Sequence, residues 1–276
     1  MGFKKAFQKF EADYEDAETE MLVLTSESLG GAGMWEKGIW QPSAEFLACV
    51  NTQSGEFKEE KGVLLWLAED KDSGKWIFNL KPLTIYKIKC RRRLQKAARG
   101  CSNYYMLTKV LSRNAKNEQL KAVRERYCLP VEINDSQCGK FILERRYSWF
   151  SGSVSLSGGD CSVYLECDED DGDTADNALR YFKKIYSSRS EWDKRLRAFA
   201  AEELTELAND WQEDSAEDGD PISRESFAER IILSEFSVDP EGGFNATFLD
   251  DDMFFGHWIV VYGDVNGGPE SADIEG

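Results

Sequence analysis

The chain has 276 residues, a formal net charge of −17 and a hydrophobic content of 41%. The length is sufficient for two ordinary domains with a well-buried core, and the composition fits a globular protein and not a disordered one. The acidic balance also disfavours general binding of nucleic acid, because a negative surface repels the phosphate backbone.

The charges are distributed unevenly along the chain. Residues 1–139 contain 22 Lys and Arg against 19 Asp and Glu, a balance of +3. Residues 140–276 contain 12 against 32, a balance of −20. A change of this size predicts a boundary between two modules. We therefore expect modules at residues 1–132 and 139–276, with a linker at Leu129–Lys140.

The cysteines and the apolar segments indicate a compartment. Seven cysteines are scattered with no C-x-x-C pair, and the first ten residues are charged. This pattern is typical of a reducing environment and unlike a zinc site, so we expect a cytoplasmic protein. No uncharged apolar run reaches the about 18 residues of a membrane span, so no membrane partner is expected.

The first module begins with an expected helix at Phe3–Thr19. Four aromatic residues recur on one face of this helix: Phe3, Phe7, Phe10 and Tyr14. The glycine-rich segment Ser28–Gly38 is expected to be a loop, and it lacks the spacing of a phosphate-binding loop. Short β-rich runs follow, which predict a small antiparallel sheet or barrel. They are Ala44–Asn51, Gly62–Ala68, Lys75–Leu80, Leu83–Cys90 and Tyr104–Leu111. A short helix is expected at Asn117–Arg126.

A basic cluster interrupts the first module at Lys87–Gly100, with sequence KIKCRRRLQKAARG. One interpretation is an anion or nucleic-acid patch built on Arg91, Arg92 and Arg93. The other is a solvated strand end and loop whose charges balance the acidic half. Few aromatic residues interleave with the basic ones, which favours the second interpretation and makes a nucleic-acid partner unexpected.

The second module has strands, then helices, then strands. Three strands are expected at Lys140–Tyr147, Phe150–Ser157 and Cys161–Cys167, with Gly158-Gly159 as a tight turn. The acidic turn Asp168–Asp173 does not fit a calcium loop, because the terminal ligand positions would be a cysteine and an alanine.

Helices and hairpins complete this module. Thr174 and Ser190 are expected to cap two helices, the second of which has a clear apolar stripe from Trp192 to Trp211. A shorter helix begins at Ser223, and hairpin-like strands follow to Ile274. This order predicts an α+β module, an antiparallel sheet with helices on one face.

Several segments of the second half together resemble a bacterial family of uncharacterised proteins, domain of unknown function 2262. They are Phe141–Gly152, Leu207–Trp211, Ile222–Ile231 and Asp252–Val261. The segment Trp66–Tyr86 resembles the amino-terminal companion domain of some members. The resemblance implies a bacterial, intracellular, two-module protein and brings no catalytic residues with it.

One polar cluster stands out as a candidate site. His257, the only histidine, follows Asp250, Asp251 and Asp252. If this segment is extended, Asp250 and Asp252 point to the same side, where they and His257 could hold Mg²⁺ or Mn²⁺. Alternatively, the aspartates satisfy backbone N–H groups of a turn while His257 bonds a nearby carbonyl or carboxylate. The polar pair Asn209 and Asp210 could extend either arrangement.

The leading hypothesis is therefore a non-catalytic module that engages a basic protein partner through its acidic half. Toxin-neutralising immunity proteins offer an analogy for such a role. No cofactor is expected. The alternative is a metal-dependent hydrolase or phosphoryl-transfer enzyme that uses Asp250, Asp252 and His257.

Overall fold

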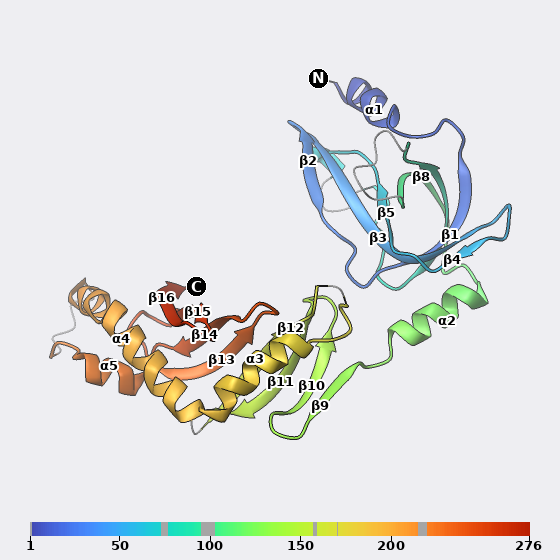
Figure 1. Ribbon diagram of the computed structural model, residues 1–276. Helices are drawn as coiled ribbons and strands as arrows, with labels where there is room; N and C mark the ends of the chain where they lie inside the picture. Colours follow the sequence, from blue (N-terminus) through green and yellow to red (C-terminus); the bar gives the residue numbers. More distant parts are fainter. Residues whose placement is uncertain (1, 73–76, 95–102, 157–158, 170, 215–219) are drawn as a thin grey trace. The chain divides into compact units, whose positions relative to one another are not determined.

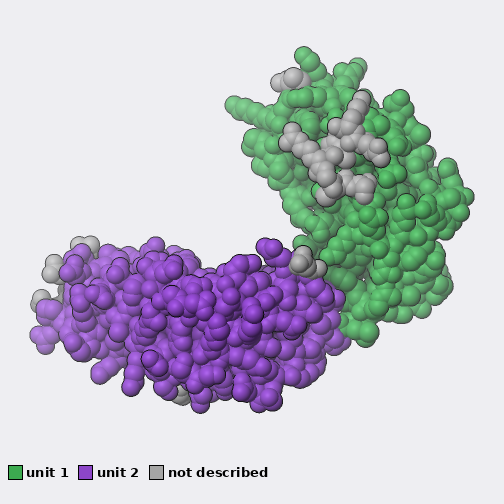
Figure 2. Space-filling model, in the orientation of Figure 1, with its two compact units in different colours: residues 1–129 green, residues 130–276 purple. Residues whose placement is uncertain are grey.

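The computed structural model describes residues 2–72, 77–94, 103–156, 159–169, 171–214 and 220–276. The chain divides into two compact units, Met1–Leu129 and Pro130–Gly276 (Figure 2). The division falls inside the segment predicted to be a linker. Each unit has its own β-sheet and its own buried core, as the two-module, α+β prediction requires.

A barrel-like sheet forms the first unit (Figure 1). Its β1 pairs with β3 on one side and with β7 on the other, which closes the sheet. All pairings are antiparallel except β5 with β8. Five strands, β1, β3, β5, β8 and β7, close the barrel, and the short strands β2, β4 and β6 pair with β3. The strands are β1 (Thr19–Thr25), β2 (Ala32–Glu36), β3 (Ile39–Asn51), β4 (Phe57–Lys58), β5 (Gly62–Leu65), β6 (Ala68–Glu69), β7 (Ile85–Arg92) and β8 (Tyr104–Arg113).

Two helices cover parts of the outer surface of this barrel. The aromatic face of α1 (Phe3–Glu11) packs on apolar residues of β5 and β8. The second helix, α2 (Glu118–Tyr127), packs against β1 and β3. It begins where predicted, because the Asn117 side chain accepts a hydrogen bond from the Leu120 N–H and so caps the helix.

Three expectations for the first unit were wrong. The first helix ends at Glu11, and the chain then turns so that Tyr14 forms a β-bridge with Arg93. The glycine-rich segment contains strand β2. The strand predicted at Lys75–Leu80 is absent over the described residues 77–80, which form a turn; residues 75–76 lie outside the described part.

An eight-stranded sheet forms the second unit, with strands in sequence order from β9 to β16. Every neighbouring pair is antiparallel except β12 with β13, because the helices between them carry the chain back across the sheet. The strands are β9 (Glu132–Asp135), β10 (Gly139–Glu144), β11 (Trp149–Ser155), β12 (Asp160–Glu166), β13 (Ile232–Val238), β14 (Gly243–Leu249), β15 (Trp258–Asp264) and β16 (Gly268–Glu275).

Three helices lie on one face of this sheet (Figure 1). They are α3 (Asp176–Ser187), α4 (Arg189–Asp214) and α5 (Arg224–Arg230). The core between the layers is rich in phenylalanine; Phe141, Phe182 and Phe236 are almost fully buried there. Helices on a single face leave the other face of the sheet without a helical cover, as the α+β prediction implied.

The linker and two helix caps differ from prediction. Residues assigned to the linker contain β9, an edge strand whose alternation is too short to be recognised in the sequence. Helix α3 is capped by Asp168, whose carboxylate accepts hydrogen bonds from the N–H groups of Asp176 and Asn177. Ser190 lies inside α4, which begins one residue earlier. The Gly158 half of the predicted turn lies outside the described residues.

Candidate functional site

The candidate aspartates lie in the tight turn that joins β14 to β15. Asp250 is 5% exposed, and both of its carboxylate oxygens accept backbone hydrogen bonds. Oδ2 accepts from the N–H groups of Phe254 and Gly256 at 2.7 and 3.2 Å. Oδ1 accepts from the N–H of Asp252 at 3.2 Å. The carboxylate therefore organises the turn, since it satisfies three backbone donors at once.

The segment that follows Asp250 is not extended. Asp251, Asp252 and Phe255 have left-handed φ angles of 48°, 64° and 56°. Asp252 is exposed, while Asp251 forms an ion pair with Arg230 at 2.7 Å. The same-side placement of Asp250 and Asp252 required an extended chain, so the turn removes its premise. Within the described ranges, no group of three or more His, Cys, Asp or Glu side chains could hold a metal ion.

His257 precedes β15 and is held by the same turn. Its Nδ1 lies 2.6 Å from the carbonyl oxygen of Phe254, so the ring N–H at Nδ1 donates to that oxygen. The indole of Trp211, near the end of α4, lies edge-on to this imidazole at 5.5 Å between ring centroids. The same indole contacts Phe254 and stacks on Phe255. The turn is thereby fixed to the helix layer.

Asn209 and Asp210 differ in their surroundings. Asn209 joins α4 to the segment before α5: its Oδ1 accepts from the N–H of Ile222 at 2.7 Å, and its Nδ2 donates to the carbonyl oxygen of Ile222 at 3.0 Å. Asp210 is exposed on α4. The structure therefore uses Asn209 to position a loop and leaves Asp210 at the surface.

The helix-free side of the second sheet, called the open face here, carries the exposed residues of each strand. Burial alternates along β12, β13 and β14, with the buried residues on the helix side. Apolar residues nevertheless occupy several open-face positions. Ile232, Leu249 and Trp258 are 57%, 45% and 52% exposed. They are direct cross-strand neighbours on β13, β14 and β15, so they form one continuous apolar row.

A group of aromatic rings, of which Tyr147 is exposed and Trp149 and Tyr164 are partly buried, lies on the β10–β12 part of the open face. Trp149 stacks on Tyr147 at 4.9 Å and contacts Tyr164 at 4.7 Å. The indole N–H of Trp149 is buried and has no hydrogen-bond partner among the described residues. Trp149 lies between two acids, because it pairs across the ladder with Glu144 on β10 and Glu166 on β12.

Acidic side chains outnumber basic ones on the open face. By the strand registers, its acids are Glu132, Glu144, Asp160, Glu166, Glu235, Asp273 and Glu275, and its one lysine among the strand residues is Lys140. Lys140 is itself paired with Glu132 at 2.6 Å. Burial, together with nearby Asp239 and Glu241, raises the pKa of Glu166. Burial first and then Glu235 raise the pKa of Tyr164. Burial is the main cause of both shifts, and the neighbouring carboxylates add to it.

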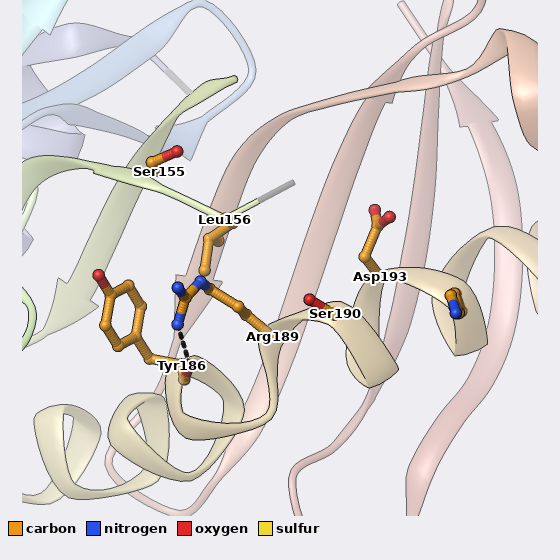
Figure 3. Close-up of a pocket in the computed structure, with 7 residues that line it drawn as sticks. Ser155, Leu156, Tyr186, Arg189, Ser190 and Asp193 are labelled. Carbon is orange, nitrogen blue, oxygen red and sulfur yellow. Dashed lines mark hydrogen bonds between the residues drawn. The ribbon is translucent and has the colours of Figure 1, made fainter. Parts of the chain in front are cut away.

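A separate hollow of about 480 Å³ opens where α3 meets α4 (Figure 3). Its lining is Ser155, Leu156, Tyr186, Arg189, Ser190, Asp193 and Lys194. The sequence offered no motif for this hollow. One wall comes from the end of β11, and the other comes from the junction of α3 and α4, about 30 residues further along the chain.

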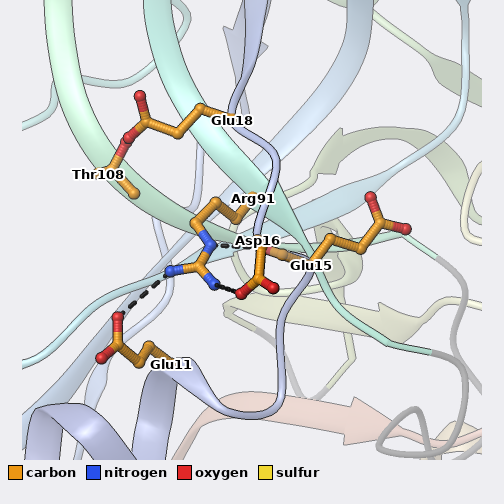
Figure 4. A network of polar contacts seen from close by, with 6 residues as sticks. All are labelled: Glu11, Glu15, Asp16, Glu18, Arg91 and Thr108. Carbon is orange, nitrogen blue, oxygen red and sulfur yellow. Dashed lines mark hydrogen bonds and ion pairs between the residues drawn. The ribbon is translucent and has the colours of Figure 1, made fainter.

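Three cations of the basic cluster of the first unit are paired with acids. Arg91 forms ion pairs with Glu11 and Asp16, each at 3.3 Å, and donates to the carbonyl oxygen of Glu15 (Figure 4). Lys87 and Lys89 pair with acids at the start of β1. Arg91 thus fastens the α1–β1 connection to β7.

The remaining arginines of the cluster differ from Arg91. Arg92 is exposed on β7, and Arg93 lies over the Tyr104 ring at 5.7 Å. Residues 95–102 lie outside the described part. Lys87, Lys89 and Arg91 are thus neutralised by acids, whereas Arg92 and Arg93 form no ion pair within the described part of the chain.

Sequence reasoning located the Asp250 turn but missed the open face. A signal for it existed, since Ile142, Trp149, Leu249 and Trp258 fall on the phase of their strands where polar residues are usual. No described helix combines the length and apolar character needed to cross a bilayer.

The comparisons with known proteins agree with the two-unit division. A family model described as an uncharacterised protein conserved in bacteria (DUF2262) matches residues 135–274. A second model, a domain of unknown function (DUF7021), matches residues 6–127 as an amino-terminal companion. A search of curated proteins gave no match. Since the first model covers half of the sequence, the chain belongs to the DUF2262 family of uncharacterised bacterial proteins.

Proposed function

We propose that the protein is a non-catalytic interaction module that binds a basic protein partner on the open face of its second sheet. The observation that carries this proposal is the apolar row of Ile232, Leu249 and Trp258 on an otherwise acidic, helix-free surface. Exposed apolar patches rimmed by polar groups are typical of docking sites.

The two parts of this surface would have different roles. Aromatic and large aliphatic side chains supply most of the binding energy of a protein interface when a partner buries them. Surrounding carboxylates attract a basic partner and fix its orientation. An immunity-like role, in which the partner is a basic toxin, is one form of this interaction.

The Asp250 turn has a supporting role in this proposal. Asp250 and His257 hold the β14–β15 connection, which directly precedes Trp258 and follows Leu249. The turn therefore sets the positions of two apolar-row residues. The carboxylate of Asp250 is 5% exposed and already accepts three backbone hydrogen bonds, and no observation favours the metal-dependent alternative.

Affinity capture with the tagged full chain tests the proposal, in extract of the source bacterium at about 50 and 500 mM salt. Two paired variants change the open face: Leu249→Ser with Trp258→Ser, and Glu166→Lys with Glu235→Lys. The control pair, Glu203→Lys with Glu206→Lys, changes exposed acids of α4 on the opposite side.

We expect a basic protein to bind the wild type and the control pair, more tightly at low salt, and to be lost from both open-face variants. Capture that is unaffected by either open-face variant would refute the proposed surface. The absence of any captured protein at both salt concentrations would refute the interaction role.

A further inference from the structure

The hollow at the α3–α4 junction is lined by two cations in the acidic half of the chain. Arg189 and Lys194 both border it, and neither forms an ion pair with a carboxylate in the described ranges. The Arg189 guanidinium lies over the Tyr186 ring at 5.0 Å and donates to the Tyr186 carbonyl oxygen at 3.4 Å (Figure 3). Most of its hydrogen-bonding capacity therefore remains unused.

The one carboxylate in the lining is already neutralised. Asp193 accepts a hydrogen bond from the Nε of Arg197 at 2.8 Å, four residues further along α4. Arg197 also donates to the carbonyl oxygen of Ala228. The net local charge of the hollow is therefore positive, although residues 140–276 carry a balance of −20. The positive charge of this hollow favours binding of an anion, whereas the acidic open face favours basic groups.

The other lining groups add donors and an apolar wall. Ser155 and Ser190 contribute hydroxyl groups from opposite sides, one at the end of β11 and one in the first turn of α4. The positive end of the α4 dipole lies on the same side as Ser190 and supports negative charge there. Leu156 supplies apolar surface. A volume of about 480 Å³ exceeds the space that a bare ion needs and lies in the range of small-molecule sites.

We propose that this hollow binds a small organic phosphomonoester, with Arg189 and Lys194 holding the phosphate and Ser155 and Ser190 donating to its oxygens. A phosphomonoester carries a charge of about −1.5 to −2 at neutral pH. This charge neutralises two cations, whereas a single carboxylate neutralises only one. Its organic part lies against Leu156. This site does not depend on the interaction role.

The experiment measures binding to the full chain by calorimetry and by the shift in melting temperature. The probes are inorganic phosphate and AMP as a simple phosphomonoester, with adenosine and sodium chloride of matched ionic strength as controls. The variants are Arg189→Gln and Lys194→Gln. The control Arg180→Gln removes the same charge from α3, where the arginine also lies over a tyrosine ring, at 5.1 Å, but outside the hollow.

We expect phosphate and AMP to bind the wild type and Arg180→Gln, AMP more tightly, and adenosine to have no effect. Each hollow variant should weaken AMP binding by about tenfold or more, because a charge-assisted hydrogen bond is lost. No binding of AMP to the wild type at about 10 mM would overturn the proposal. So would equal binding of adenosine, binding of phosphate without AMP, or unchanged affinity in both hollow variants.

Discussion

Replacing Asp250 by asparagine tests the role of the β14–β15 turn most sharply. The carboxylate accepts hydrogen bonds from the N–H groups of Asp252, Phe254 and Gly256 and is 5% exposed. An asparagine offers one acceptor oxygen in place of two. Its amide N–H groups then face at least one of these backbone donors, which cannot turn to water because the site is buried.

The expected cost follows from these contacts. Leaving one donor unsatisfied and making the other bonds neutral lowers the free energy of unfolding by about 2–4 kcal/mol. For a unit of about 150 residues, this corresponds to a fall in melting temperature of about 5–12 °C. The exchange preserves side-chain shape, so loss of packing does not contribute.

Asp252→Asn is the matched control. Asp252 is exposed and has a left-handed φ of 64°, a conformation that asparagine also tolerates. We expect its melting temperature to stay within about 2 °C of the wild type. Thermal unfolding followed by circular dichroism compares the three proteins. A melting temperature of Asp250→Asn equal to that of the wild type, or an equal fall in both variants, would refute the structural role of Asp250.

Three further predictions follow from other contacts. The hydrogen bond from Lys183 holds the pKa of Asp135 at about 2 instead of 3.8, so the stabilising effect of the ionised carboxylate is complete above about pH 4 and is lost as the pH falls toward 2. In urea titrations, Asp135→Asn should lower stability at pH 6 and flatten this dependence on pH. A Cβ on Gly152 would lie 2.5 Å from the Phe141 ring, so Gly152→Ala should destabilise the second unit by about 1–3 kcal/mol, and wild-type stability would contradict the packing described. Arg91→Gln should speed amide hydrogen exchange in α1 several-fold by releasing its connection to β7, whereas unchanged exchange would show that aromatic packing alone holds the helix.

Much of the second unit could be predicted because its signals are local. Alternating residues mark β11 and β12, and helical spacing marks α4 over its whole length. The start of the short helix was predicted at Ser223, and Ser223 is the residue that caps α5, since its side chain accepts from the Ser226 N–H. The first unit was harder to predict. Its barrel depends on pairings between distant segments, such as β1 with β7, and these leave no pattern within either strand.

The candidate site was predicted in part, because its residues lie close together in the sequence. The sequence indicated that an aspartate would satisfy a turn and that His257 would bond a carbonyl oxygen, and Asp250 and His257 do so. Of the two neighbouring phenylalanines, Phe254 is buried in the core and Phe255 is exposed. Three left-handed residues cannot be anticipated from composition, because the buried carboxylate stabilises them only after the turn has formed.

The central claim is that the open face of the second sheet is the surface that meets a partner. Site-specific photo-crosslinking in living cells of the source bacterium tests it most directly, with a photoreactive residue at position 249 on the open face or at position 203 on α4. We predict an adduct with a basic protein from position 249 and none from position 203. An adduct from position 203 alone, or none from either position, would contradict the claim.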